Sequence, residues 1–66
     1  MSKIDEMAAE LQISPKELVK QVVEREGSFE EAARVFECYP NTVKQRLAKY
    51  GLKAIPFRGL RVVEKS

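Results

Sequence analysis

The residues with the most informative chemistry lie between Pro40 and Tyr50. If this segment is a helix, turning about 100° per residue, one face carries side chains that can contact base edges. These are Asn41, Lys44, Gln45 and Ala48. Asn and Gln bond adenine edges in a bidentate way in the major groove, and Lys reaches guanine acceptors. The flanks carry Thr42, Arg46 and Lys49, which suit phosphate oxygens. No acid interrupts this surface, so the segment predicts a DNA-reading helix.

The signals at both ends of this segment support a helix. Pro40 suits the first helical position, where no N–H partner is needed and φ is already helical. Val43, Leu47 and Tyr50 lie four and three residues apart and predict the inward stripe. Gly51 is expected to end the helix in a left-handed conformation.

A short helix is also expected directly before this segment. Ser28 can cap it, and Gly27 suits the end of the helix that comes earlier still. Ala32, Ala33 and Phe36 then fall on one side, and the two alanines are small enough to let another helix cross closely. Two short helices joined by a few residues predict a helix-turn-helix.

The chain from Gly27 to Leu52 resembles the Fis-type helix-turn-helix at the C-terminal end of many bacterial transcription activators, and the wider homeodomain-like class. The matching residues are Gly27-Ser28, Ala32-Ala33, Pro40 to Leu47 and Tyr50-Gly51-Leu52. The resemblance implies that Asn41, Lys44 and Gln45 face bases. It also implies that Thr42, Arg46 and Lys49 face the DNA backbone.

The turn departs from that family pattern at two positions. Glu37 stands where the family usually has glycine, so we expect a left-handed or strained backbone there. Tyr39 stands where a serine or threonine cap is usual. Further backbone contacts are expected from side chains outside the helix face: Ser28, Tyr39, Lys53, Arg58 and Arg61.

Two more helices are predicted before the helix-turn-helix. Ser2 starts one that ends near Gln12, with the apolar stripe Ile4, Met7, Ala8 and Leu11. It would either pack over the core or serve as a dimerisation arm. Ser14-Pro15 starts the next, which runs to Glu26 and buries Leu18, Val19, Val22 and Val23 to support the three-helix core.

The expected fold is all-α, a bundle of about four helices over residues 1–54, followed by an extended basic C-terminal tail over residues 55–66. Pro56 and Gly59 interrupt any helix there, and Ile55, Phe57 and Val62 favour extended structure. Three alternatives stay open for this tail. It folds back on the core, pairs with the same strand of a second protomer, or forms a basic arm or wing along DNA.

Composition narrows the function classes. Residues 1–31 hold eight acidic and four basic side chains, a balance of −4, and residues 32–66 hold two acidic and eight basic side chains, a balance of +6. That asymmetry suits steering toward a polyanion. With one cysteine and no histidine, we expect no metal site, no cofactor and no enzyme activity, and Cys38 is expected to be a small buried apolar group. The absence of a membrane span or secretory signal predicts a cytoplasmic protein.

The sequence therefore predicts a double-stranded DNA-binding protein with sequence preference, most simply a small transcriptional regulator acting as a homodimer. The competing hypothesis is a helical adaptor or inhibitor that uses the same basic face on an acidic protein partner. A basic face that is merely solvated is the third alternative.

Overall fold

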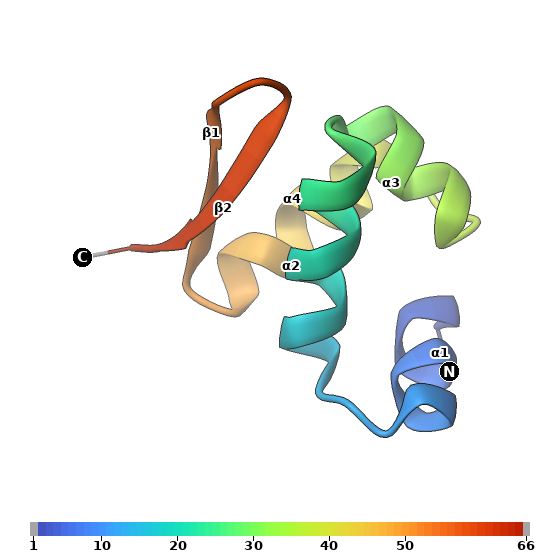
Figure 1. Ribbon diagram of the computed structural model, residues 1–66. Coiled ribbons are helices and arrows are strands. Elements are labelled where there is room, and N and C mark those ends of the chain that lie inside the picture. The colour runs from blue at the N-terminus through green and yellow to red at the C-terminus, as the bar shows by residue number, and fades with distance from the viewer. Residues whose placement is uncertain (1, 66) are drawn as a thin grey trace.

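The computed structural model describes residues 2–65, which form four helices followed by two strands (Figure 1). The helices are α1 (Lys3–Leu11), α2 (Pro15–Glu26), α3 (Phe29–Val35) and α4 (Pro40–Lys49). The strands are β1 (Leu52–Pro56) and β2 (Leu60–Glu64), and they form one antiparallel hairpin.

The expectation of an all-α fold with an extended tail is wrong, because the C-terminal segment forms this two-stranded sheet. Ala54 pairs with Val62, and Pro56 pairs with Leu60 on either side of a three-residue turn. Two β-favouring runs separated by a short glycine-containing loop are a hairpin signal. β1 also begins at Leu52, so the expected boundary between residues 54 and 55 falls inside a strand.

The predicted helix starts are confirmed at three serines. The hydroxyl of Ser2 accepts the N–H of Asp5, that of Ser14 accepts Glu17, and that of Ser28 accepts Glu31. Each contact satisfies a backbone donor that has no partner within the helix. The predicted end of α2 at Gly27 is also confirmed, and so is the left-handed conformation predicted for Gly51, which has φ +72°.

One hydrophobic core joins all the elements. Val19, Val23 and Val43 are fully buried, and Phe36 is 1% exposed. The stripe predicted for α2 is confirmed. The stripe predicted for α4 is confirmed at Val43 and Leu47, whereas Tyr50 follows the helix and is half-buried. In α1, Ile4 and Ala8 are buried as expected, which shows this helix packed over the core.

The predicted stripe of α1 is wrong at its end. Leu11 is 58% exposed, because the helix ends at this residue and Gln12 turns into the left-handed region with φ +58°.

The hairpin lies along α2, so the first of the three alternatives for the tail describes its place in the fold. Leu52 and Val62 point into the core from neighbouring strands. The N–H of Val62 donates to the Glu24 carboxylate at 2.9 Å, and Lys16 contacts Glu64 at 2.9 Å. The strand edge that faces α2 is thereby capped by a side chain of the helix.

The turn between α3 and α4 has the strained backbone expected from the sequence. Glu37 has φ +53°, in the region that favours glycine. Its N–H donates to the Arg34 carbonyl, and the N–H of Cys38 donates to Ala33 at 3.0 Å. These bonds close the end of α3 and let α4 begin at Pro40.

Candidate nucleic-acid interface

The outer face of α4 presents polar and basic side chains to solvent. All four residues expected to face bases are exposed: Asn41, Lys44, Gln45 and Ala48. Lys49 on the flank is exposed as well, whereas Thr42 is half-buried. The opposite face is fixed by Val43 and Leu47, which are buried. The core therefore holds α4 in one rotation about its axis.

Lys44 is held over the start of α3. Its Nζ atom lies 5.3 Å from the centroid of the Phe29 ring, which is a cation–π distance. Phe29 is the first residue of α3, so this contact ties the exposed face of α4 to the partner helix of the pair. Lys44 remains exposed while it makes this contact.

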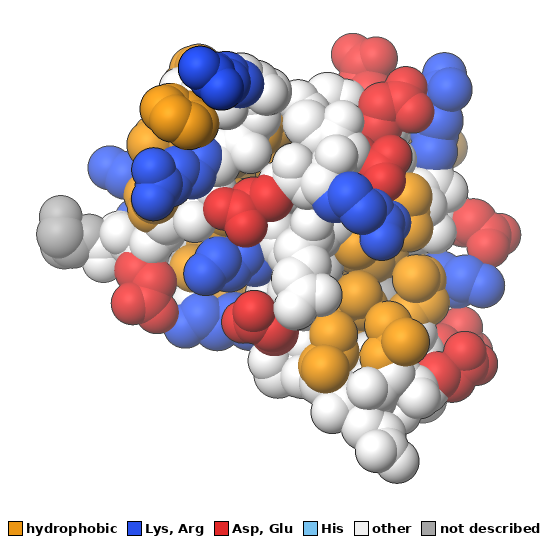
Figure 2. All heavy atoms as spheres, viewed as in Figure 1, with side chains coloured by type: hydrophobic (Ala, Val, Ile, Leu, Met, Phe, Trp, Pro, Cys, Tyr) orange, Lys and Arg blue, Asp and Glu red, His pale blue; other side chains and the backbone are white. Residues whose placement is uncertain are grey.

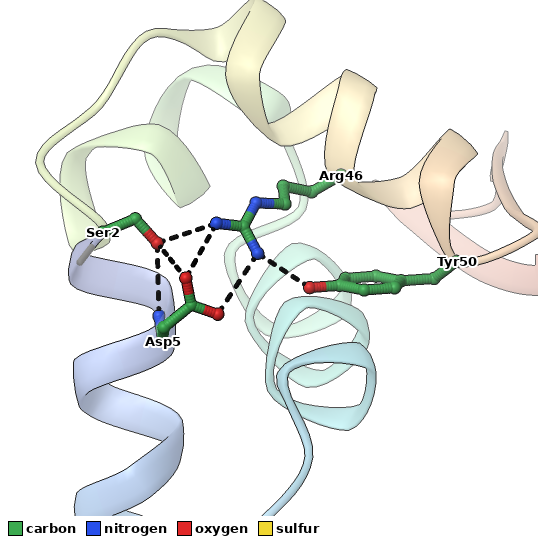
Figure 3. A network of polar contacts seen from close by, with 4 residues as sticks. All are labelled: Ser2, Asp5, Arg46 and Tyr50. Atoms are coloured by element: carbon green, nitrogen blue, oxygen red, sulfur yellow. Dashed lines mark hydrogen bonds and ion pairs between the residues drawn. The ribbon is translucent and has the colours of Figure 1, made fainter.

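Arg46 lies in a network of hydrogen bonds that reaches back to α1 (Figure 3). Its Nη2 atom donates to Asp5 Oδ2 at 2.9 Å and to Ser2 Oγ at 2.8 Å. Its Nη1 atom donates to Tyr50 Oη at 2.8 Å and to Asp5 Oδ1 at 3.3 Å. The guanidinium thus meets the carboxylate as a fork, the geometry that favours Arg over Lys.

The ionisation of this network follows from its contacts. The hydrogen bond from Arg46 is the largest effect, and together with that from Ser2 it lowers the pKa of Asp5 to about 2. The hydrogen bond to Asp5 in turn raises the pKa of Arg46 above its ordinary value. Both groups are charged at neutral pH, and the Arg46 side chain is only 19% exposed. The guanidinium of Arg46 is therefore engaged in hydrogen bonds within the chain and is largely buried. Lys49, by contrast, is exposed to solvent.

No pattern in the sequence predicted the contact between Asp5 and Arg46, which are 41 residues apart. The bond between Arg46 and Tyr50 had a signal, because residues four apart share a helix face. A second, exposed pair joins Lys3 to Glu37 at 3.2 Å, so α1 contacts both the turn and α4 through charged groups.

The residues around the helix-turn-helix differ in solvent exposure and in hydrogen bonding. Tyr39 is 80% exposed, makes no capping hydrogen bond and stands directly before α4. Ser28 is half-buried, and its hydroxyl oxygen is engaged as the cap of α3. Cys38 is half-buried, and burial raises the pKa of its thiol. The thiol therefore has less nucleophilic character than an exposed one.

The basic residues of the hairpin are all exposed. Lys53 and Arg61 lie on the outer face, opposite the core-facing Leu52 and Val62, and Arg58 lies in the turn. Figure 2 shows the α2 side of the molecule, where both acidic and basic side chains lie at the surface. At the tip of the hairpin, upper left in that view, basic and apolar side chains lie together.

The candidate interface is a surface rather than a cavity. Residues 2–65 enclose no pocket, and among them no group of three or more His, Cys, Asp or Glu side chains is placed to hold a metal ion. Across the same residues, no helix combines the length and apolar composition needed to cross a membrane.

Comparisons of the chain with protein-family models, with curated proteins and with solved structures return no match. The resemblance of residues 27–52 to the Fis-type helix-turn-helix therefore stays a prediction. Support for a function comes from the exposed surface of α4 and of the elements next to it.

Proposed function

We propose that the protein binds double-stranded DNA by placing α4 in the major groove, with a preference for particular sequences. One observation carries the proposal: Asn41, Lys44, Gln45 and Ala48 share an exposed face of α4 that contains no acid. Amide and ammonium groups on one helix face suit the donor and acceptor pattern of base edges in the major groove.

The neighbouring elements suit contacts to the DNA backbone. Lys49 lies on the flank of α4, and the exposed Tyr39 stands at its start. The half-buried Thr42 can still present its hydroxyl at the edge of the same helix. Lys53 extends the basic surface into β1. We assign Arg46 a structural role instead, because Asp5, Ser2 and Tyr50 already engage its guanidinium.

A homodimer fits this proposal, since one such helix makes few base contacts. Two half-sites about one helical turn apart would raise both affinity and specificity. Regulation of transcription is the role we propose for such a protein.

The first test is the fluorescence anisotropy of a random-sequence duplex, titrated with the protein at several salt concentrations. We expect binding whose logarithmic salt slope corresponds to about four or more phosphates per protomer, at roughly −0.9 each. Absence of binding even at low salt would contradict the proposal. The basic face would then be assigned to an acidic protein partner.

Substitutions on α4 separate base contacts from backbone contacts. We expect Lys44→Ala and Gln45→Ala to change which sequences are selected from a random pool. Lys49→Ala should weaken binding to all sequences about equally and reduce the salt slope by about one unit. All three side chains are exposed, so the fold should be retained. If none of the three variants changed DNA binding, α4 would not be the reading helix.

A further inference from the structure

The tip of the hairpin carries an aromatic ring and arginines at the surface. Phe57 is 60% exposed, although most large apolar side chains of the chain are buried in the core or packed against it. The guanidinium carbon of Arg61 lies 5.6 Å from the centroid of this ring. Arg58 lies between them in sequence and is exposed. The Phe57 ring therefore does not contribute to the hydrophobic core.

The backbone of the turn places Arg58 at the outermost point of the hairpin. The N–H of Phe57 donates to the carbonyl of Gly59 at 3.2 Å, so these two residues close the turn and Arg58 is its middle residue. Arg58 has φ +52°, a conformation in which glycine would be less strained. The turn therefore keeps a long cationic side chain where folding alone favours glycine.

The tip is fixed beside the helix-turn-helix. A Cβ atom on Gly59 would lie only 3.2 Å from Gly27 Cα, so the backbone of the turn rests on the end of α2. Figure 1 shows the tip next to the end of α2 and the start of α3. Two residues beyond Gly27, the ring of Phe29 lies under Lys44. The short segment from Gly27 to Phe29 thus contacts the tip at one end and Lys44 of α4 at the other.

The molecule is shorter than one helical turn of B-DNA. The principal extents are 29 × 24 × 18 Å. One helical turn of B-DNA, which presents a major and a minor groove in succession, spans about 34 Å. The separation between the tip and α4 is therefore smaller than one turn of DNA.

From this arrangement we propose that the hairpin tip is a second DNA-binding element, which inserts Arg58 into the minor groove adjacent to the major-groove site of α4. The inference rests on the function proposed above. A guanidinium is attracted by the negative potential of a narrow A·T-rich minor groove. The exposed ring of Phe57 suits contact with the apolar sugar and base edges of that groove, and Arg61 reaches the adjoining phosphate.

The test uses two duplexes that share the central site selected by the wild-type protein and differ only in their flanks, A·T-rich or G·C-rich. We expect the wild-type protein to bind the A·T-flanked duplex about fivefold more tightly or better. Arg58→Gly should abolish this preference, and Phe57→Ala should reduce it. Lys49→Ala is the matched control, since it should weaken binding to both duplexes and keep the preference.

Arg58→Gly also separates function from folding. Because glycine relieves the left-handed backbone, its melting temperature should equal or exceed that of the wild-type protein. Arg58→Asn, which also tolerates this conformation, provides a second variant with the same expected loss of preference.

The possible failures are distinguishable. Failure of the wild-type protein to bind any duplex would overturn the DNA-binding function and the role of the hairpin together. If the wild-type protein bound and selected a site, but Arg58→Gly bound both duplexes as the wild-type protein does, only the role of the hairpin would be overturned. If Arg58→Gly weakened binding to both duplexes by the same factor, insertion of Arg58 into the minor groove would likewise be overturned.

Discussion

Two cations on one flank of α4 have different surroundings. Arg46 and Lys49 are three residues apart, and the resemblance assigned both to the DNA backbone. In the structure, Arg46 is held by the Asp5 carboxylate and is 19% exposed, whereas Lys49 is exposed. Helical spacing describes which side of its own helix a residue occupies, but the neighbouring helix decides what that side touches.

Replacing Arg46 by Lys tests this structural role. Lysine keeps the charge but lacks the planar fork that bonds both oxygens of Asp5 and also Tyr50. We therefore expect Arg46→Lys to lower the melting temperature measured by circular dichroism. Lys49→Arg, on the same flank and exposed, is the control and should leave it nearly unchanged. Equal melting temperatures for both variants would mean that the network does not stabilise the fold.

The same network predicts a pH dependence. The folded state lowers the pKa of Asp5 from 3.8 to about 2, so the unfolded chain takes up the proton first as the pH falls. The stabilisation is complete above the unfolded pKa and is lost as the pH falls through about 2. We expect Asp5→Asn to show a smaller decrease in unfolding free energy between about pH 4 and pH 2.

Glu64→Gln is the comparison for that titration. Lys16 lowers the pKa of Glu64 as well, but this pair is well exposed, with 74% of the Glu64 side chain accessible. Exposed ion pairs stabilise little, so its effect should be the smaller of the two. A larger effect from Glu64→Gln than from Asp5→Asn would contradict the assignment.

At the scale of elements, the hairpin depends on α2 for its position. Val62 bonds Glu24, Lys16 meets Glu64, and the turn rests on Gly27. A two-stranded hairpin is only marginally stable alone in water. Contacts along the whole of α2 supply the support that the two strands lack.

Gly59→Ala tests the contact at the tip. Alanine at this position would be strained by φ +117° and would bring its Cβ to 3.2 Å from Gly27 Cα, where neither backbone can move away cheaply. Gly51→Ala is the control. Alanine there would also be strained, by φ +72°, but its Cβ would meet no neighbouring atom within 4 Å. We expect Gly51→Ala to cost about 1 kcal/mol of unfolding free energy and Gly59→Ala clearly more. Equal costs in urea titrations would show that the close approach does not matter.

At the scale of the molecule, helices and hairpin share one core. Leu52 and Val62 belong to the same buried cluster as Val43 and Phe36. The chain should therefore unfold as one cooperative unit. The loss of helix and the exposure of the hairpin to solvent should have the same transition midpoint.

Val62→Ala tests this shared core. Val62 is 3% exposed, and losing its two methyl groups should cost about 2 kcal/mol, with the helix signal melting at a lower temperature. Its neighbour Val63 is half-buried on the outer face of the same strand, so Val63→Ala should cost less. Val62→Ala would leave the helix melt unchanged only if the hairpin were an independent appendage.

Local signals in the sequence determined the helices. Serine caps, a proline at the first helical position, and glycines in left-handed conformations act within a few residues of one another, so they can be recognised without the fold. Periodicity then identified the buried faces of α2 and α4, and the exposed face of α4 follows from the same spacing. The strained turn at Glu37 was predicted instead from the glycine that the resembling family usually has at this position.

Only the tertiary structure decided how distant segments meet. The bond between Asp5 and Arg46 joins residues 41 apart, and that between Glu24 and Val62 joins residues 38 apart. Such contacts depend on the packing of whole elements, which no local pattern encodes. The same packing paired the C-terminal segment with itself, engaged Arg46 within the chain, and brought the turn that carries Arg58 against the end of α2, because the core fixes all of these elements together.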